Sequence, residues 1–282
     1  MHIHLDQLWK SFGPKTVLKG LSLEVDQGET YCIIGRSGAG KSVTLKHITG
    51  LMKPDRGKIM IDGKDVTNTS ERKYDALRKR MGVVFQDAAL IKWLSVGENV
   101  ALPLRELDRI RDREIRTRVA EKLALVELKG CEALMPDSIS GGMKKRVGIA
   151  RAMIRDPELI LFDEPTSGLD PVMSNQINEL VLHLQERTGV TSLVVTHDMT
   201  SAYMIGNRIG MFYQGEIIDE GTPEDIQGST NPITRQFIEG RPRGPITTGD
   251  EKFIVHEEAE EAEPESYTGD SESDGSSQEV EE

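Results

Sequence analysis

The first sixty positions alternate between apolar and polar residues in the pattern of short β-strands separated by turns. This alternation predicts strands around residues 3–8, 21–25 and 59–61. Between the last two, residues 30–34 form an apolar run that ends at a glycine-rich loop. A strand without alternation is typical of a sheet that is covered on both faces.

Helix-like and strand-like segments follow one another in the rest of the chain. Apolar residues recur with helical spacing in residues 113–128 and 172–187. Two further apolar runs, residues 159–162 and 192–196, predict buried strands that end at polar residues. Because strands and helices alternate, we predict an α/β fold with a parallel sheet and helices on its faces. Ligands of such sheets bind at the carboxyl ends of the strands.

The periodic pattern fades after residue 233. Residues 241–250 are rich in Pro, Gly and Thr and predict an extended linker, and the acidic, Ser-rich segment from Glu251 onward predicts a disordered tail. From Asp250 to the end, the chain has 14 acidic residues and one lysine. This tail therefore has a net charge of −13, whereas the whole chain has a net charge of −12. The remaining 249 residues are therefore nearly neutral, and we expect no nucleic-acid partner.

Cysteine content and hydropathy exclude other classes. The two cysteines are far apart in sequence, which excludes a disulfide scaffold and argues against a four-ligand zinc site. The start of the chain, MHIHLDQLW, lacks the features of a signal peptide, and no run approaches the ~20 apolar residues of a membrane helix. We expect a cytosolic protein that reaches a membrane only through a partner.

The strongest chemical signal is GRSGAGKS at residues 35–42, which fits the phosphate-binding pattern G-x-x-x-x-G-K-[ST]. Glycines let successive N–H groups point at one phosphate chain, and the following helix adds the positive end of its dipole. Lys41 is expected to contact the β- and γ-phosphates, and Ser42 to bind Mg²⁺. A chance glycine-rich turn is the alternative, and the flanking strand and helix argue against it. The predicted nucleotide ligands are Gly35, Arg36, Ser37, Gly38, Ala39, Gly40, Lys41, Ser42 and Val43.

Further polar residues follow the predicted buried strands. In LILFDEP, Asp163 is expected to bind Mg²⁺, and Glu164 to orient and polarise the attacking water. Paired carboxylates after a strand are more often capping or solvated groups, but a phosphate loop beside them favours catalysis. His197, in VVTHD, is predicted to contact the γ-phosphate or water, and Gln86 to reach Mg²⁺ and the water. Lone histidines and strand-end glutamines are commonly structural, which is the competing interpretation.

These motifs in this order resemble the ATP-binding subunits of ABC transporters over roughly residues 1–228. The discriminating motif is ISGGMKKR at residues 139–146. In the family, this signature loop caps the γ-phosphate of the ATP held by the other subunit. The resemblance therefore implies a head-to-tail homodimer in which Ser140, Gly141 and Gly142 contact ATP. Taken alone, the same segment is compatible with a glycine turn that opens a helix.

The resemblance also implies an architecture and cofactors. The fold would be that of a P-loop ABC ATPase, with a RecA-like parallel-sheet core and a small antiparallel β subdomain. An inserted α-helical subdomain would span about residues 87–156, followed by a C-terminal extension at 229–249 and the acidic tail at 250–282. The activity would be ATP hydrolysis with Mg²⁺, coupled to transport.

Individual family positions can be matched as well. Phe12 occupies the place of an aromatic ring that stacks on adenine, although a surface-packed phenylalanine is the alternative. Residues 167–170 match the loop that lies across the dimer seam, and Gln86 matches the link to the helical subdomain. The region 87–105 is expected to dock a permease, with Trp93 either exposed for this purpose or packed inside the helical subdomain.

One departure from the family is informative. Met143 stands where most members carry glutamine, and methionine cannot donate amide hydrogen bonds. Together with FQDAALI, ENVALPLRE and RQFIEGRPRGPI, this variant is similar to the ATPases of the Mla and Mce lipid-transport systems. That similarity implies an integral membrane permease, a lipid-binding MCE protein, and a place on the cytoplasmic face of the inner membrane. It also suggests that residues 231–246 brace the dimer.

Three other functions compete with this interpretation. The chain could serve another ABC importer, for amino acids or metal ions, with the same catalytic residues. It could be a soluble ABC ATPase that acts on ribosomes or DNA, although such proteins usually contain two cassettes or extra insertions. It could also be a silent regulatory subunit, against which Lys41, Asp163, Glu164 and His197 argue.

Overall fold

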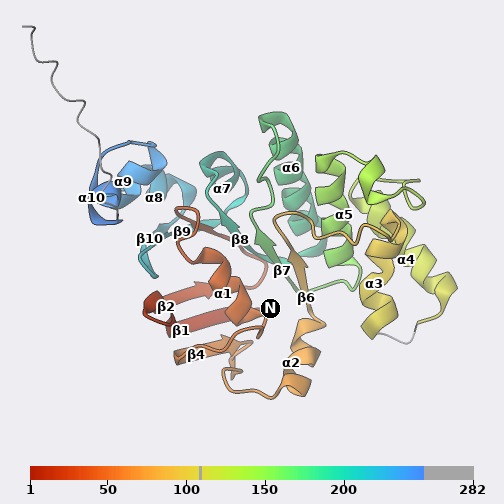
Figure 1. Ribbon diagram of the computed structural model, residues 1–282, viewed down its shortest axis with the longest axis horizontal. Coiled ribbons are helices and arrows are strands. Elements are labelled where there is room, and N and C mark those ends of the chain that lie inside the picture. The colour runs from red at the N-terminus through yellow and green to blue at the C-terminus, as the bar shows by residue number, and fades with distance from the viewer. Residues whose placement is uncertain (108–109, 251–282) are drawn as a thin grey trace, which may run out of the picture.

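Two β-sheets form the framework of the computed structural model, which describes residues 1–107 and 110–250 (Figure 1). The larger sheet has six strands, and its neighbours pair in parallel except at one edge, where β10 runs antiparallel to β9. The parallel α/β core predicted from the sequence is thus confirmed. The strand order is β10 (Glu216–Gly221), β9 (Arg208–Tyr213), β3 (Thr30–Ile34), β8 (Thr191–Thr196), β7 (Leu159–Asp163) and β6 (Met81–Val84).

The smaller sheet is antiparallel and contains the N-terminal strands. Its strands form where the first sixty residues alternate between apolar and polar side chains, because one face of this sheet is buried and the other is exposed. The strand order is β2 (Lys15–Val25), β1 (Ile3–Phe12), β4 (Arg56–Ile61) and β5 (Lys64–Asp65).

Helices surround the larger sheet, and α3, α4 and α5 pack on one another at one end of the molecule (Figure 1). The helix predicted over residues 113–128 corresponds to α4 and ends three residues early, since Glu127 adopts a positive φ of 62°. None of the described helices is long and apolar enough to cross a membrane. The helices are α1 (Lys41–Ile48), α2 (Glu71–Arg78), α3 (Val96–Leu107), α4 (Asp112–Leu125), α5 (Gly141–Met153), α6 (Pro171–Thr188), α7 (Met199–Ile205), α8 (Pro223–Gln227), α9 (Pro232–Ile238) and α10 (Pro245–Asp250).

The core consists of two apolar clusters, one on each face of the larger sheet. Along β3, Tyr31 and Ile33 belong to the cluster shared with the smaller sheet, whereas Cys32 and Ile34 belong to the cluster under the helices. Both faces are therefore covered, which is why this strand is apolar throughout. Burial raises the pKa of the Cys32 thiol well above its ordinary value, so this side chain acts as a small apolar group.

The C-terminal region differs from the sequence-based prediction. Residues 241–250 were predicted to form an extended linker, and this prediction is wrong, because residues 245–250 form α10. The backbone N–H of Ile246 donates to Gln236 Oε1 on α9 at 2.8 Å, and the Ile246 side chain is buried. Tertiary packing imposes this short helix, which has too few residues to form alone.

The predicted domain boundaries remain predictions, as does a brace formed by residues 231–246 across a dimer. The acidic tail predicted from residue 250 lies, beyond its first residue, outside the described part of the chain.

Candidate functional site

The phosphate-binding loop joins β3 to α1, and its path depends on glycine. Gly35 has a φ of 151°, and a Cβ there would lie 2.5 Å from the Phe212 carbonyl oxygen. Gly40 has a φ of 117°, and a Cβ there would lie 2.6 Å from Val17 Cγ1. Other residues at these two positions would be strained and would clash, so glycine is required for the loop to curl against β2 and β9.

Lys41 lies inside this loop. Its side chain is 4 % exposed, and Nζ donates to the carbonyl oxygens of Gly35 at 2.7 Å and Arg36 at 2.9 Å. Nζ also lies 3.6 Å from Glu164 Oε1. Burial lowers the pKa of Lys41, while the charges of Glu164 and Asp163 act in the opposite direction. A cation surrounded by the curled loop is well placed to contact phosphate oxygens.

Two carboxylates follow β7 at the same edge of the sheet. Ser42 Oγ donates to Asp163 Oδ1 at 2.7 Å, which brings together two oxygen ligands of the kind that Mg²⁺ prefers. Glu164 is 7 % exposed and adopts a φ of 51°, a left-handed conformation that is strained for a residue with a side chain. Its backbone N–H donates to the Val195 carbonyl at 2.9 Å, which ties this conformation to β8.

His197 contacts the second of these carboxylates. Its Nδ1 lies 2.8 Å from Glu164 Oε2, and because a carboxylate only accepts hydrogen bonds, Nδ1 carries the hydrogen. The fold therefore brings together Lys41, Glu164 and His197, with the Ser42–Asp163 pair beside them. These residues come from three separate segments of the sequence, all predicted to reach this edge.

Gln86, which follows β6, lies at the same edge but points to a different partner. Its Nε2 donates to Ser167 Oγ at 3.2 Å, and its side chain is exposed. Ser167 and His197 line a hollow of about 350 Å³ together with Leu169 and Asp198. Contact between Gln86 and Mg²⁺ remains a prediction.

The signature residues open helix α5. Ser140 Oγ accepts a hydrogen bond from the Met143 N–H at 3.3 Å and so caps the helix. A Cβ on Gly142 would lie 2.1 Å from Met173 Cε, and one on Gly141 would lie 3.7 Å from Leu169. These glycines therefore lie against the segment that follows Glu164. The partly buried Met143 packs on the core, which gives this apolar residue a structural role.

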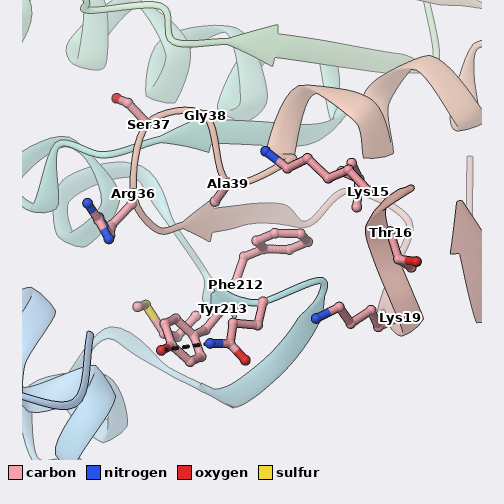
Figure 2. Close-up of a pocket in the computed structure, with 12 residues that line it drawn as sticks. Lys15, Thr16, Lys19, Arg36, Ser37, Gly38, Ala39, Phe212 and Tyr213 are labelled. Atoms are coloured by element: carbon pink, nitrogen blue, oxygen red, sulfur yellow. Dashed lines mark hydrogen bonds between the residues drawn. The ribbon is translucent and has the colours of Figure 1, made fainter. Parts of the chain in front are cut away.

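A further hollow of about 450 Å³ adjoins the phosphate loop (Figure 2). Lys15 and Lys19 of β2 and Arg36 of the loop line it, and Phe212 and Tyr213 of β9 lie between them in Figure 2. Phe12 pairs with Lys15 across the turn between β1 and β2, and this residue is 45 % exposed. An accessible aromatic ring thus borders this basic hollow, and stacking of adenine on it remains a prediction.

Two features were missed or left open by the sequence. Trp93 is 80 % exposed, so the alternative in which it packs inside the helical subdomain is wrong. Near it, an apolar hollow of about 430 Å³ is lined by Phe85, Ala89, Ile91 and Leu102, among others. Lys145 lies within the signature motif and has no role predicted from the sequence, yet it is buried. Its spacing of four residues before the buried Ile149 was the available signal.

Comparisons with known proteins agree with this geometry. The family model described as ABC transporter matches residues 18–167. The chain is 42 % identical over 250 residues to the probable ribonucleotide transport ATP-binding protein mkl of Mycobacterium bovis, covering 89 % of this chain and 70 % of the relative. It is 39 % identical over 234 residues to the intermembrane phospholipid transport system ATP-binding protein MlaF of Haemophilus influenzae, covering 83 % and 89 %.

An importer ATPase and a solved structure are also similar. The Fe(3+) ions import ATP-binding protein FbpC of Photobacterium profundum is 37 % identical over 249 residues, covering 84 % of this chain and 69 % of the relative. A dimeric ATP-binding cassette in a post-hydrolysis state, bound to ADP and Pi, superposes with a TM-score of 0.72 at 35 % identity. The superposed region covers 78 % of this chain and 98 % of the cassette.

Proposed function

The chain belongs to the ABC transporter family and is an ATPase, and we propose that it powers phospholipid transport as a homodimer docked on a membrane permease. The observation that carries this proposal is the meeting of Lys41, Glu164 and His197 at one sheet edge beside the Ser42–Asp163 pair. Such an arrangement holds a triphosphate and positions water for phosphoryl transfer.

A second copy would complete the site. Ser140 and Gly141 are exposed at the start of α5, and Gly141 lies near Leu169, in the segment after Glu164. In a head-to-tail dimer, the N-terminus of α5 would approach the γ-phosphate bound by the partner, where its free N–H groups and dipole favour an anion. The dimeric cassette that the chain resembles supports this arrangement.

The residues at the site divide the chemistry between them. When ATP enters, its β- and γ-phosphates replace the loop carbonyls and Glu164 as partners of Lys41. Glu164 is then released to accept a hydrogen bond from the attacking water. His197, which donates from Nδ1, holds the carboxylate in place, and its exposed ring reaches toward the γ-phosphate. Because the transition state is loose, this positioning matters more than strong basicity.

Ser42 and Asp163 fit a magnesium ion, since their oxygens already lie 2.7 Å apart and are hard ligands. We assign them as its protein ligands, with Gln86, which follows β6, as a further candidate. When bound, Mg²⁺ would neutralise charge on the β- and γ-phosphates. Adenine would stack on the exposed ring of Phe12, beside the basic hollow.

The similarity to the phospholipid transport ATPase MlaF supports phospholipid as the cargo of the complex. The exposed Trp93 and the apolar hollow beside Phe85 and Leu102 form a surface suited to helices of the permease. Docking there would hold the chain on the cytoplasmic face of the inner membrane. A lipid-binding MCE protein would complete the system. The iron-importer relative supports a second candidate, an importer of metal ions with the same catalytic residues.

Mixing two inactive variants tests the shared site. Lys41→Ala removes the phosphate contact, and Gly141→Asp places a negative charge at the exposed start of α5. Each variant alone is expected to lack ATPase activity. In a head-to-tail heterodimer of the two, one of the sites combines an intact phosphate loop with an intact signature. Equal amounts should therefore recover about a quarter of wild-type turnover if the sites act independently. No recovery, while the two chains are shown to associate, would contradict the shared site.

A further inference from the structure

A buried lysine on the signature helix lies outside the mechanism described so far. Lys145, in the second turn of α5, is 6 % exposed. Its Nζ donates to the carbonyl oxygen of Gln86 and lies 3.4 Å from the carbonyl oxygen of Glu164. Both acceptors are backbone groups rather than carboxylates, so the ammonium is held without a direct ion pair. Burying such a group is unfavourable unless its hydrogen bonds are satisfied.

Burial lowers the pKa of Lys145, and the charges of Asp87 and Glu164 oppose that change. A methionine or leucine would fill this space with less desolvation, so packing alone does not account for a lysine here. The two carbonyls that it joins belong to the segments after β6 and after β7, which are also linked by the hydrogen bond from Gln86 to Ser167.

Both of these segments have strained backbones. Ala88 and Ala89, just after Gln86, have φ values of 58° and 45°, and Glu164 has a φ of 51°. Conformations of this kind persist only where neighbouring groups hold them. Lys145 contacts one carbonyl in each segment, and it is therefore placed to hold both.

Helix α5 supports the segment after Gln86 at two more points. Arg151 donates to the carbonyl oxygens of Ala88 and, at 2.7 Å, Ala89. A Cβ on Gly148 would lie 3.2 Å from the Ala88 Cβ, so the helix and this segment are in close contact. The helix is therefore packed closely on this segment, and Lys145 extends the connection to the backbone of Glu164.

We propose that Lys145 is a positioning residue that transmits the placement of the signature helix to Gln86 and to the catalytic Glu164. This proposal rests on the proposed dimer, in which the first turn of α5 contacts the ATP of the partner. Lys145 lies only one turn beyond Ser140, on a continuous helix. When the signature residues contact the ATP of the partner, Lys145 would thus fix the backbone position of Glu164 in its own chain.

Substitutions in the full-length protein separate positioning from packing. Lys145→Met keeps the length and apolar contacts of the side chain but removes its hydrogen bonds, and Lys145→Arg keeps a buried cationic donor. Lys144→Met is the matched control, because the neighbouring lysine lies on the same helix and is only partly buried. We expect Lys145→Met to lower kcat roughly 10- to 100-fold, with KM for ATP and thermal stability near those of the wild type.

In the same assay, Lys145→Arg should recover part of kcat, and Lys144→Met should match the wild type. A kcat of Lys145→Met equal to that of the wild type would overturn the proposal. The proposal would also be overturned if Lys145→Met lost activity only because less protein folded or because ATP affinity fell. Either result would mean that Lys145 serves packing and not positioning.

A second measurement separates this proposal from the dimer on which it rests. Glu164→Gln, which is expected to bind ATP without hydrolysing it, should form an ATP-dependent dimer, and the Lys145→Met/Glu164→Gln double variant should do the same in sedimentation. A monomeric Glu164→Gln protein would refute the dimer and the transmission with it. A dimeric Glu164→Gln protein together with full turnover of Lys145→Met would refute the role of Lys145 alone.

Discussion

At the scale of single residues, Lys41 and Glu164 stand out because they are partners in the structure and would be separated by substrate. Their Nζ and Oε1 atoms lie 3.6 Å apart, and both side chains are largely buried. Binding of ATP would supply Lys41 with phosphate oxygens and leave Glu164 for the water. The same ammonium would therefore change its pKa between the unliganded and the ATP-bound protein.

This change predicts a pH dependence of ATP binding. Burial holds the pKa of Lys41 below its ordinary 10.5 in the unliganded protein, and phosphate oxygens would raise it. Between the lowered pKa of Lys41 in the unliganded protein and its higher pKa in the ATP complex, binding takes up a proton, so ATP affinity should fall as the pH rises through this interval. Calorimetry in buffers of different ionisation enthalpy measures both the affinity and the proton uptake.

Lys41→Arg is the control for this measurement, because an arginine stays charged over the whole range. Its ATP affinity is expected to be lower overall but nearly independent of pH. An identical pH profile for the two proteins would show that Lys41 is not the titrating group.

At the scale of elements, short helices in this protein form where tertiary contacts stabilise them. Helix α10 has six residues, and it is held through Ile246, which packs in the core and donates its N–H to Gln236. Helix α5 instead stabilises a neighbouring loop, because its Arg151 donates hydrogen bonds to the strained segment after Gln86. In both cases, the element and its neighbour depend on each other.

The role of α10 can be measured with two truncations. A chain that stops after Gly240 loses Ile246 and leaves Gln236 Oε1 without its donor. It should lose roughly 1.5–3 kcal/mol in the free energy of unfolding, the value of burying such a side chain. Denaturant unfolding monitored by circular dichroism provides the measurement.

A chain that stops after Asp250 is the matched control. It loses only the acidic segment 251–282, whose composition cannot bury much apolar area, so its ATPase activity and stability should match those of the full chain. Equal stability of the two truncated proteins would mean that α10 contributes nothing to the fold.

At the scale of the whole molecule, the two apolar clusters join three layers into one body, and the functional surfaces lie at its edges. The nucleotide site lies at the carboxyl ends of the central strands, between the phosphate loop and the loop after β7. The helices α3 to α5 extend away from it at one end (Figure 1). A signal from the site to a partner would therefore pass through this helical group.

Trp93 provides the prediction at this scale. Because Trp93 is 80 % exposed in the proposed docking region, Trp93→Ala should weaken binding to the proposed permease partner by about 2 kcal/mol, roughly 30-fold. Leu51→Ala is the control, since Leu51 is 68 % exposed but lies outside that region. The affinities are measured with the permease in detergent. Equal losses for both variants would argue against docking at Trp93.

The sequence by itself determined the parallel core, because strands covered on both faces must be apolar throughout. Such apolar runs occur at residues 30–34 and 159–162. It also determined the chemistry of the phosphate loop, since the spacing of Gly35, Gly40 and Lys41 matches the phosphate-binding motif, and the positive φ of both glycines is a local requirement.

Only the tertiary structure decided the features that depend on contacts between distant segments. No local pattern places the Lys145 ammonium between the carbonyls of Gln86 and Glu164, because these groups are brought together by three different elements. The same holds for α10, whose few residues are helical only when Ile246 is buried, and for Trp93, whose exposure depends on how the helical group packs. Local propensity is a property of a segment, whereas burial and hydrogen-bond partners are properties of the assembled fold.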